Sequence, residues 1–314
     1  MRPGPASLPV VVLVGPTASG KTAVAASLGV RIPLEVISAD SMQVYRSLPI
    51  LSQAPSAAVR KRVRHHLVLR HPAREEYNAA RFAEDARKLI PRIRARGRLA
   101  LVVGGTGLYV RALVDGLFKG PAKNAALRSR LERRARRHGA PFLHAELAAE
   151  DAEAAAKIHP NDLRRIIRAL EVIRGTGEKF SDLKKRRRGL AAEEPVRLYG
   201  LRLDRADLYR RINRRTDKMF RSGAVEEVKR VLKKPLSMTS RMCLGVREIG
   251  AYLEGRAARG EALEALKRES RRYAKRQIAW FKSDTRIRWI TVTPRSKPGA
   301  IARLIADDLW NARS

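Results

Sequence analysis

The chain has 314 residues, 44% of them hydrophobic, which is enough for a packed core and argues against wholesale disorder. Lysine and arginine number 67 against 31 aspartates and glutamates, and the formal net charge of +36 favours a polyanionic partner, nucleic acid, over a mere bias toward arginine. The single cysteine, Cys243, excludes an intramolecular disulfide and a cysteine-rich zinc site. With no targeting segment and no apolar run long enough to span a membrane, we expect a cytoplasmic protein with no membrane partner.

Short apolar runs alternate with helical patterns in the first third of the chain. Residues 10–14 form a continuous, mostly β-branched run, which is typical of a central parallel strand. In chain order, we expect a strand at 10–14, a helix at 21–28, a strand at 34–38, a helix at 78–96 and a strand at 99–103. This order predicts an α/β fold whose open parallel sheet is flanked by helices.

The pattern becomes mainly helical from about Gly120. Helices are expected at 125–137, 145–157 and 162–174, the third capped by Asn161 or Asp162, before five consecutive basic residues at 184–188. We therefore predict a helical insertion at 121–194, between a first core segment at 8–120 and its completion at 195–314. In that last segment we expect a strand at 196–203, helices at 207–232 (with a break near Gly223) and 261–282, a strand at 287–292 and a helix at 298–310.

The first predicted strand runs directly into the sequence GPTASGKT, which matches the pattern Gly, four residues, Gly, Lys, Ser or Thr. Glycines let the backbone curl so that several amide groups point at one anion, and the helix that follows adds its positive end. Lys21 supplies a mobile charge, and the Thr22 hydroxyl is a candidate Mg²⁺ ligand. We predict a P-loop that binds a diphosphate or triphosphate, formed by Gly15, Pro16, Thr17, Ala18, Ser19, Gly20, Lys21 and Thr22.

The loop alone does not say whether its phosphates belong to ATP. A common nucleotide hydrolase or kinase places an aspartate after a later apolar strand to hold the magnesium shell, but here the strand at 99–103 is followed by Gly104, Gly105 and Thr106. The acid instead follows the second strand, as Asp40. Ligands of open α/β sheets bind at the carboxyl edge of the strands, so this position favours a catalytic role for Asp40 over a cap or turn role.

Together with five later blocks, these features resemble the tRNA dimethylallyltransferase family. Beyond GPTASGKT, the matching blocks are ISADSMQVYR (37–46), VGGTGLYVRAL (103–113), KIHPNDLRRIIRALEV (157–172), RRINRRTDKMFRSGAVEEV (210–228), CLGVREIGAYLEG (243–255) and AKRQIAWFK (274–282). Seven blocks in this order cover nearly the whole chain. The resemblance implies a P-loop core with a helical domain that clasps the tRNA anticodon stem-loop. It also implies transfer of a dimethylallyl group from dimethylallyl diphosphate, with Mg²⁺, to N6 of adenosine 37.

The resemblance also implies roles for individual residues. Asp40 matches the general base, Thr106 the threonine set against the target adenine, and Arg215 the arginine that stabilises the departing diphosphate, with Arg214 as a second candidate. This chemistry suits an adenine amine, which must lose a proton as it attacks. The implied tRNA contacts are Asp40, Ser41, Met42, Gln43, Thr106, Arg128, Arg164, Arg165, Ile166, Ile167 and Arg168. An adenine stacked in the anticodon loop must also be extruded before it can react.

One segment departs from the family pattern. After Tyr45 the family reads Asp-Ile-Gly-Thr, a small residue and Lys-Pro, whereas this chain has Leu-Pro-Ile-Leu-Ser-Gln-Ala-Pro at 48–55. The adjacent His65 and His66 are a poor metal site without further ligands, and packing is the better interpretation.

Three alternatives to tRNA prenylation remain. They are prenylation of a free adenine nucleotide, an ATP-dependent P-loop kinase, and RNA binding without catalysis. The basic charge argues against the first, Gly104 to Thr106 against the second, and Asp40 beside the phosphate loop against the third. Nothing in the sequence requires more than a monomer.

Overall fold

The computed structural model describes residues 4, 8–118, 120–121 and 124–311, which form two compact units. The first unit comprises the described residues of Met1–Val114 and Glu193–Ser314, and the second comprises those of Asp115–Ala192. The expected insertion at 121–194 covers most of the second unit. Each unit has its own apolar core.

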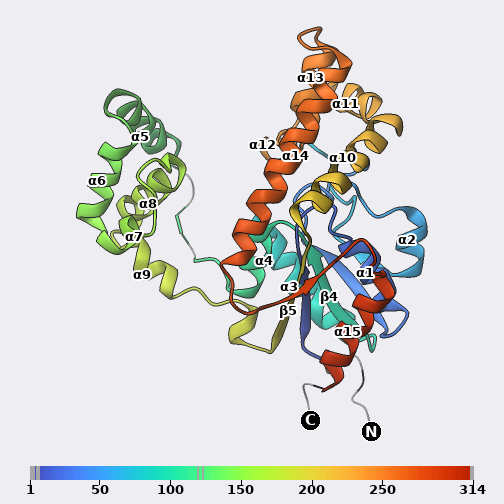
Figure 1. Ribbon diagram of the computed structural model, residues 1–314. Helices are drawn as coiled ribbons and strands as arrows, with labels where there is room; N and C mark the ends of the chain where they lie inside the picture. Colours follow the sequence, from blue (N-terminus) through green and yellow to red (C-terminus); the bar gives the residue numbers. More distant parts are fainter. Residues whose placement is uncertain (1–3, 5–7, 119, 122–123, 312–314) are drawn as a thin grey trace. The chain divides into compact units, whose positions relative to one another are not determined.

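The first unit is built on a six-stranded sheet in which every strand pair is parallel (Figure 1). The spatial order is β3-β2-β4-β1-β5-β6. The strands are β1 Val10–Val14, β2 Leu34–Ser38, β3 His65–His66, β4 Leu99–Gly104, β5 Val196–Arg202 and β6 Ile287–Thr291. The predicted α/β class, its parallel sheet and the five predicted strands are confirmed. Strand β3 was not predicted, because two histidines carry no strand pattern.

Four helices of the first unit, at 57–62, 107–114, 238–241 and 246–253, were not predicted, and the bounds of the predicted ones agree to within about two residues. Helices surround the sheet. They are α1 Lys21–Gly29, α2 Ala57–Arg62, α3 Ala79–Arg94, α4 Gly107–Val114, α10 Arg205–Arg221, α11 Ala224–Leu232, α12 Met238–Arg241, α13 Val246–Leu253, α14 Arg259–Lys282 and α15 Pro298–Asn311. The expected break near Gly223 is confirmed: this glycine has a φ of +94° and separates α10 from α11.

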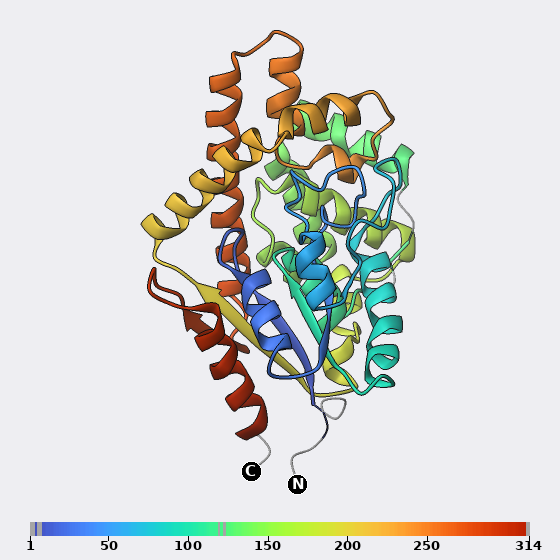
Figure 2. The same ribbon diagram turned by 90° about the vertical axis from the view of Figure 1, so that its right-hand side faces the viewer.

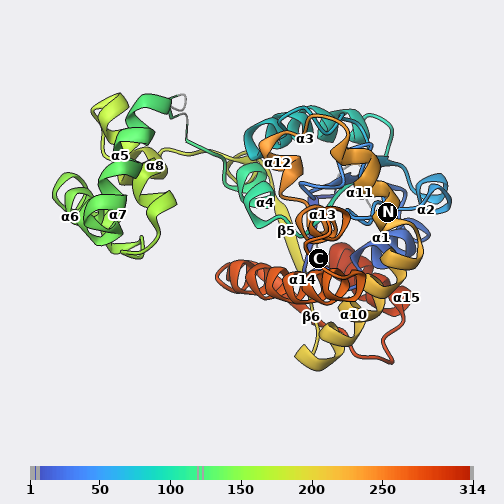
Figure 3. The same ribbon diagram turned by 90° about the horizontal axis from the view of Figure 1, so that it is seen from above.

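Alternate residues of the central strands face opposite layers of helices. Val11 and Leu13 of β1 belong to a buried cluster with residues of α1 and α15, for example Leu28 and Ile305. Val12 is equally buried but lies outside that cluster, because successive side chains of a strand point to opposite faces. On that other face α3 contacts β2 and β4, and α3 and α15 lie on opposite sides of the sheet (Figure 2; Figure 3).

The second unit is helical, as expected. It contains α5 Ala125–His138, α6 Ala140–Glu150, α7 Ala152–Ala156, α8 Leu163–Thr176, α9 Phe180–Lys185 and a 3₁₀ turn at Leu190–Ala192. Its core gathers Leu131, Leu143, Leu147, Ile166 and Leu170. None of the described helices in either unit is both long and apolar enough to cross a membrane.

One predicted helix is wrong. The expected helix at 145–157 is two helices, α6 and α7, which meet at Asp151. The buried Asp151 carboxylate accepts hydrogen bonds from the main-chain N–H groups of Ala154 (2.9 Å) and Ser181 (2.8 Å). An aspartate that caps the second helix in this way ends the first one. The alternative caps proposed for α8 are resolved in favour of Asp162, which accepts from the N–H of Arg165 at 3.2 Å.

Strand β2 carries a buried carboxylate near its amino end. Glu35 is 2% exposed, and its oxygens accept two hydrogen bonds from Arg96, at 2.9 and 2.7 Å. His66 of β3 lies 2.6 Å away through Nε2. Burial opposes the charged form, but the hydrogen bonds from Arg96 and His66 outweigh it and lower the pKa of Glu35 to about 2. The two histidines of β3 therefore pack: Nδ1 of His65 lies 2.7 Å from the Val63 carbonyl oxygen.

The low pKa of Glu35 makes a pH-dependent contribution to stability. A folded-state pKa below the unfolded value means that the carboxylate stabilises the fold above about pH 4.5, and that this stabilisation is lost as the pH falls toward about 2. We expect Glu35→Gln to lower the free energy of unfolding by about 3 kcal/mol at neutral pH, and by less as the pH falls through this window.

Urea unfolding at several pH values measures this effect. The control is Glu84→Gln, because the Glu84 side chain is 65% exposed and pairs with Lys88 on the surface of α3. It should leave the free energy of unfolding close to that of the wild type, because exposed ion pairs contribute little. A Glu35→Gln loss that stayed the same across the pH range would contradict the assignment.

Candidate active site

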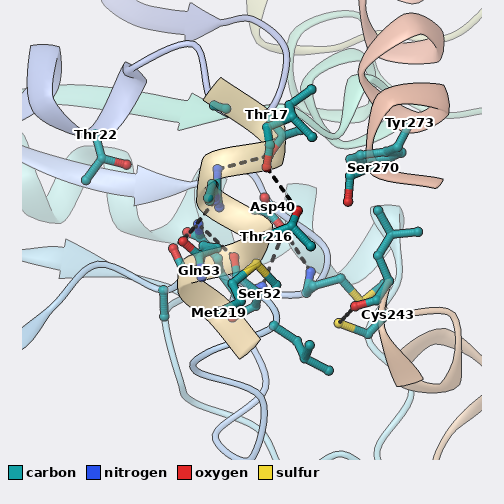
Figure 4. Close-up of a pocket in the computed structure, with 18 of the residues that line it drawn as sticks. Thr17, Thr22, Asp40, Ser52, Gln53, Thr216, Met219, Cys243, Ser270 and Tyr273 are labelled. Atoms are coloured by element: carbon teal, nitrogen blue, oxygen red, sulfur yellow. Dashed lines mark hydrogen bonds between the residues drawn. The ribbon is translucent and has the colours of Figure 1, made fainter. Parts of the chain in front are cut away.

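A cavity of about 1300 Å³ opens at the carboxyl ends of β1, β2 and β4. The phosphate loop, the turn after β2, residues 51–55 and helices α10 and α14 line it (Figure 4). Its polar lining includes Lys21, Asp40 and Arg215, and its apolar lining includes Leu51, Ile212, Met219, Leu244 and Leu266. The cavity therefore combines groups that bind an anion with surface that accepts a small apolar group.

The predicted phosphate loop has the backbone geometry of an anion site. Gly20 and Ala18 have left-handed φ values of +94° and +63°, and α1 begins at Lys21. Ser19 is 1% exposed, and its hydroxyl has no hydrogen-bond partner among the described residues. Helix α1 presents its positive end to this loop, which favours a bound anion.

Lys21 lies inside the cavity. Its Nζ donates to the main-chain oxygens of Gly15 (2.9 Å) and Pro16 (2.8 Å). Burial, opposed by the Asp40 carboxylate and assisted by the Arg215 cation, lowers the pKa of Lys21 to about 7. A bound anion would raise this pKa again, since it favours the charged ammonium.

Asp40 lies in the turn that follows β2, as predicted. Its Oδ1 accepts from the N–H groups of Met42 (2.9 Å) and Gln43 (3.4 Å), so one oxygen shapes the turn. Its Oδ2 accepts no hydrogen bond from the residues that the structure describes. The turn and catalytic interpretations of Asp40 are thus compatible, because each uses a different oxygen.

Thr106 is held beside Asp40 by a close approach of two strand ends. A Cβ added to Gly104 would lie 2.0 Å from the Ala39 carbonyl oxygen, so only glycine fits there. The Thr106 N–H donates to that same oxygen at 3.2 Å, and its Oγ1 accepts from the Ser41 N–H at 3.1 Å. Threonine and aspartate, far apart in the sequence, are therefore neighbours at one wall of the cavity.

Arg215 of α10 reaches the phosphate loop, whereas Arg214 is exposed at the cavity rim. The Nη1 of Arg215 donates to Thr17 Oγ1 at 3.0 Å and its Nε donates to Gln53 Oε1 at 2.9 Å. Burial lowers the pKa of Arg215 to about 10, and the Asp40 charge partly opposes this shift. Of the two candidate arginines, Arg215 has the position to meet an anion on the loop.

Two residues of α14 complete the site, and sequence reasoning missed both. The side chain of Gln277, 5% exposed, accepts from the Thr17 N–H (2.8 Å) and donates to the Gly105 carbonyl (2.9 Å). Tyr273, one turn earlier, interacts through its hydroxyl with Thr106 and Gln277. Gln277 thus joins the phosphate loop to the loop that carries Thr106. The block at 274–282 marked this helix, but nothing in its pattern showed which side chain faces the site.

The residues predicted to contact tRNA have different environments. Among those after Asp40, the Gln43 side chain accepts from Ser38 Oγ (2.9 Å) and donates to the Gln53 carbonyl (3.2 Å). Ser41 and Met42 are half-buried in the cavity wall.

In the second unit, Arg164 and Arg165 are exposed on α8. Arg128 and Arg168 both bind the buried Glu171, at 3.0 and 2.7 Å. Ile166 and Ile167 are 0% and 4% exposed and belong to the core of the second unit. The side chains of these two isoleucines pack on the apolar stripe of α8, facing away from solvent, and contact of these residues with tRNA stays a prediction.

The described residues provide few ligands for a metal ion. Among the described residues, no group of three histidine, cysteine, aspartate or glutamate side chains is arranged to hold a metal ion. Mg²⁺ is commonly bound by one or two protein oxygens together with phosphate and water. Thr22 and Asp40 both line the cavity and fit that smaller requirement.

Comparison with known proteins places this geometry in a family. The family described as IPP transferase matches residues 43–284. The chain is 43% identical over 281 residues to a tRNA dimethylallyltransferase of Carboxydothermus hydrogenoformans, which covers 89% of this chain and 90% of that protein. It is 42% identical over 289 residues to the tRNA dimethylallyltransferase of Bacillus subtilis, over 91% of each.

Comparison with solved structures points to the same family. The full-length tRNA isopentenylpyrophosphate transferase of Bacillus halodurans aligns with a TM-score of 0.70 at 38% identity, over 98% of both chains. A eukaryotic dimethylallyltransferase, described as acting on tRNA, aligns with a TM-score of 0.79 at 26% identity over 98% of this chain and 81% of that one. The chain belongs to the IPP transferase family.

Proposed function

We propose that this enzyme transfers a dimethylallyl group from dimethylallyl diphosphate to N6 of adenosine 37 in tRNA. The observation that carries the proposal is that one cavity holds a phosphate loop and, beside it, a carboxylate oxygen of Asp40 to which the described residues donate no hydrogen bond. A kinase could use both the loop and a carboxylate, but the acid that commonly holds its magnesium shell after a later strand is absent here, where Gly104, Gly105 and Thr106 follow residues 99–103. The names of the relatives and the excess of basic residues support tRNA as the acceptor.

The donor would bind with its diphosphate on the loop. Amide groups of the loop, Lys21 and Arg215 surround that position, and the apolar part of the cavity, including Ile212 and Met219, would take the five-carbon group. Thr22 would help to hold Mg²⁺, which when bound helps to neutralise the diphosphate. These charges act most strongly as the leaving group gains charge in the transition state.

In the transfer step, N6 of the adenine attacks C1 of the donor. The C1–O bond breaks, the N6–C1 bond forms, and diphosphate leaves with the electron pair of the broken bond. The N6 proton passes to Oδ2 of Asp40, the oxygen that the turn does not use. Thr106 would orient the amine by one hydrogen bond, since its hydroxyl lies next to Ser41 at the same wall.

A transfer assay identifies the acceptor. With labelled dimethylallyl diphosphate and Mg²⁺, we expect label to enter tRNA and neither AMP nor ATP. A tRNA with guanosine at position 37 is the matched control and should stay unlabelled, because it lacks the exocyclic amine at C6. Label in AMP would identify an adenylate prenyltransferase, and phosphoryl transfer from ATP would identify a kinase.

A substitution at Asp40 separates the roles of its two oxygens. The Asp40→Asn variant keeps a carboxamide oxygen for the turn but cannot accept the proton, so we expect kcat to fall about 10²- to 10⁴-fold with tRNA affinity unchanged. Asp204→Asn is the control, because Asp204 Oδ1 accepts a similar pair of bonds from Ala206 and Asp207 in an exposed turn. Loss of tRNA affinity together with turnover would make Asp40 structural.

Exposed arginines of the second unit are candidates for contact with RNA. Arg164 and Arg165 are exposed on α8, so we propose that they contact tRNA phosphates. Replacing both with alanine should weaken tRNA binding and lower the slope of log affinity against log salt by about 1 to 2. Arg303→Ala, an exposed arginine on α15, should leave the slope unchanged. An unaltered slope in the double variant would remove these arginines from the interface.

A further inference from the structure

The segment at 48–55, where the chain departs from its family pattern, is fixed against the cavity from two sides. The main-chain N–H groups of Ile50 and Leu51 each donate to the buried carboxylate of Glu227, at 2.8 Å. Gln43, from the turn after Asp40, donates to the Gln53 carbonyl at 3.2 Å. The segment is therefore a rigid wall of the site.

Gln53 adopts a costly conformation in this wall. Its φ is +54°, a left-handed value that costs a non-glycine residue about 1 kcal/mol or more. Its side chain is fixed at both ends: Nε2 donates to the Ile50 carbonyl at 2.7 Å, and Oε1 accepts from Arg215 Nε at 2.9 Å. The left-handed backbone at Gln53 thus directs its neutral carboxamide oxygen toward the Arg215 guanidinium.

Arg215 is held entirely by neutral groups. Besides Gln53, its side chain bonds to the Thr17 hydroxyl at 3.0 Å, and no carboxylate of the described residues pairs with it. Figure 4 shows Thr17 and Gln53 beside the same helix, α10. Many other arginines of the chain, such as Arg96 and Arg128, pair directly with carboxylates. A carboxylate at position 53 would hold the guanidinium more strongly but would neutralise it and repel an incoming anion.

We propose that Gln53 is a positioning residue of the donor site: its carboxamide oxygen holds the Arg215 guanidinium toward the phosphate loop without neutralising it, which leaves the full charge for a diphosphate. The proposal rests on the proposed function only in taking diphosphate as the anion. In this chain the segment at 48–55 therefore contributes to anion binding through Arg215 of α10.

Two substitutions separate positioning from simple packing. Gln53→Glu keeps an acceptor for Arg215, adds a negative charge and loses the Nε2 donor to the Ile50 carbonyl. Gln53→Met keeps the length of the side chain and removes both the donor and the acceptor. We expect Gln53→Glu to remain folded, since it gains an ion pair with Arg215 as it loses the hydrogen bond to Ile50, but to bind inorganic diphosphate at least about tenfold more weakly, because it neutralises the guanidinium. We expect Gln53→Met to weaken diphosphate binding by a few fold to about tenfold, since Arg215 is no longer held.

The measurement is calorimetric titration of the full chain with inorganic diphosphate, together with melting temperature, donor KM and kcat. Ala58→Glu is the control, since it adds one negative charge on the exposed face of α2 next to the segment without facing Arg215. It should leave the diphosphate affinity within about twofold of the wild type, because exposed charges are screened.

The outcomes are distinct. If a folded Gln53→Glu binds diphosphate as tightly as the wild type, the neutrality of the acceptor is irrelevant and the proposal is overturned. If Gln53→Glu does not fold, an unchanged diphosphate affinity in Gln53→Met overturns it equally. A wild-type protein that binds diphosphate but labels no tRNA would defeat the proposed function and leave the comparison among these variants intact.

Discussion

The site depends on one close approach of backbone to backbone. At Gly104 the end of β4 passes so near the Ala39 carbonyl that a Cβ would lie 2.0 Å from that oxygen. The absence of a side chain lets the N–H of Thr106 reach Ala39, and it brings the turn that carries Asp40 against the loop that carries Thr106. A larger residue at 104 would force these two strand ends apart. The acceptor side of the cavity rests on this contact.

Charged side chains dominate the part of the cavity where the diphosphate would bind. Among the charged groups that line the cavity, burial lowers the pKa of two cations, Lys21 and Arg215, and the Asp40 carboxylate partly opposes both shifts. Their contacts with the protein are mainly with neutral oxygens: carbonyls for Lys21 and a hydroxyl and a carboxamide for Arg215. Cations held in this way lack close counter-ions, so an anionic ligand gains most from binding there. Gln277 then links the donor loop to the acceptor loop through its two amide atoms.

The basic residues of the chain fall into two groups. Some pair with buried carboxylates inside the protein, and others are exposed on its surface. Glu171, 1% exposed, binds both Arg128 and Arg168, and Glu35 gathers Arg96 and His66. These arginines hold elements together, so their presence in the sequence does not by itself mark an RNA surface. Exposed residues such as Arg164 and Arg165 are better candidates for phosphate contacts, because they are not committed to a buried carboxylate.

The sequence by itself determined the class of fold, the order of five strands, the phosphate loop and the family, because these depend on local patterns: β-branched runs, glycine spacing and ordered motif blocks. It also singled out Asp40 and Arg215. It could not show that the helix predicted at 145–157 breaks at Asp151, or that Gln53 and Gln277 contact other residues of the site. Each of these depends on a partner distant in the chain, such as Ser181 for Asp151, Arg215 for Gln53 and Gly105 for Gln277. Only the tertiary structure decides which of many polar side chains meet, because hydrogen bonds of this kind form over a few ångströms of space and leave no periodic trace in the sequence.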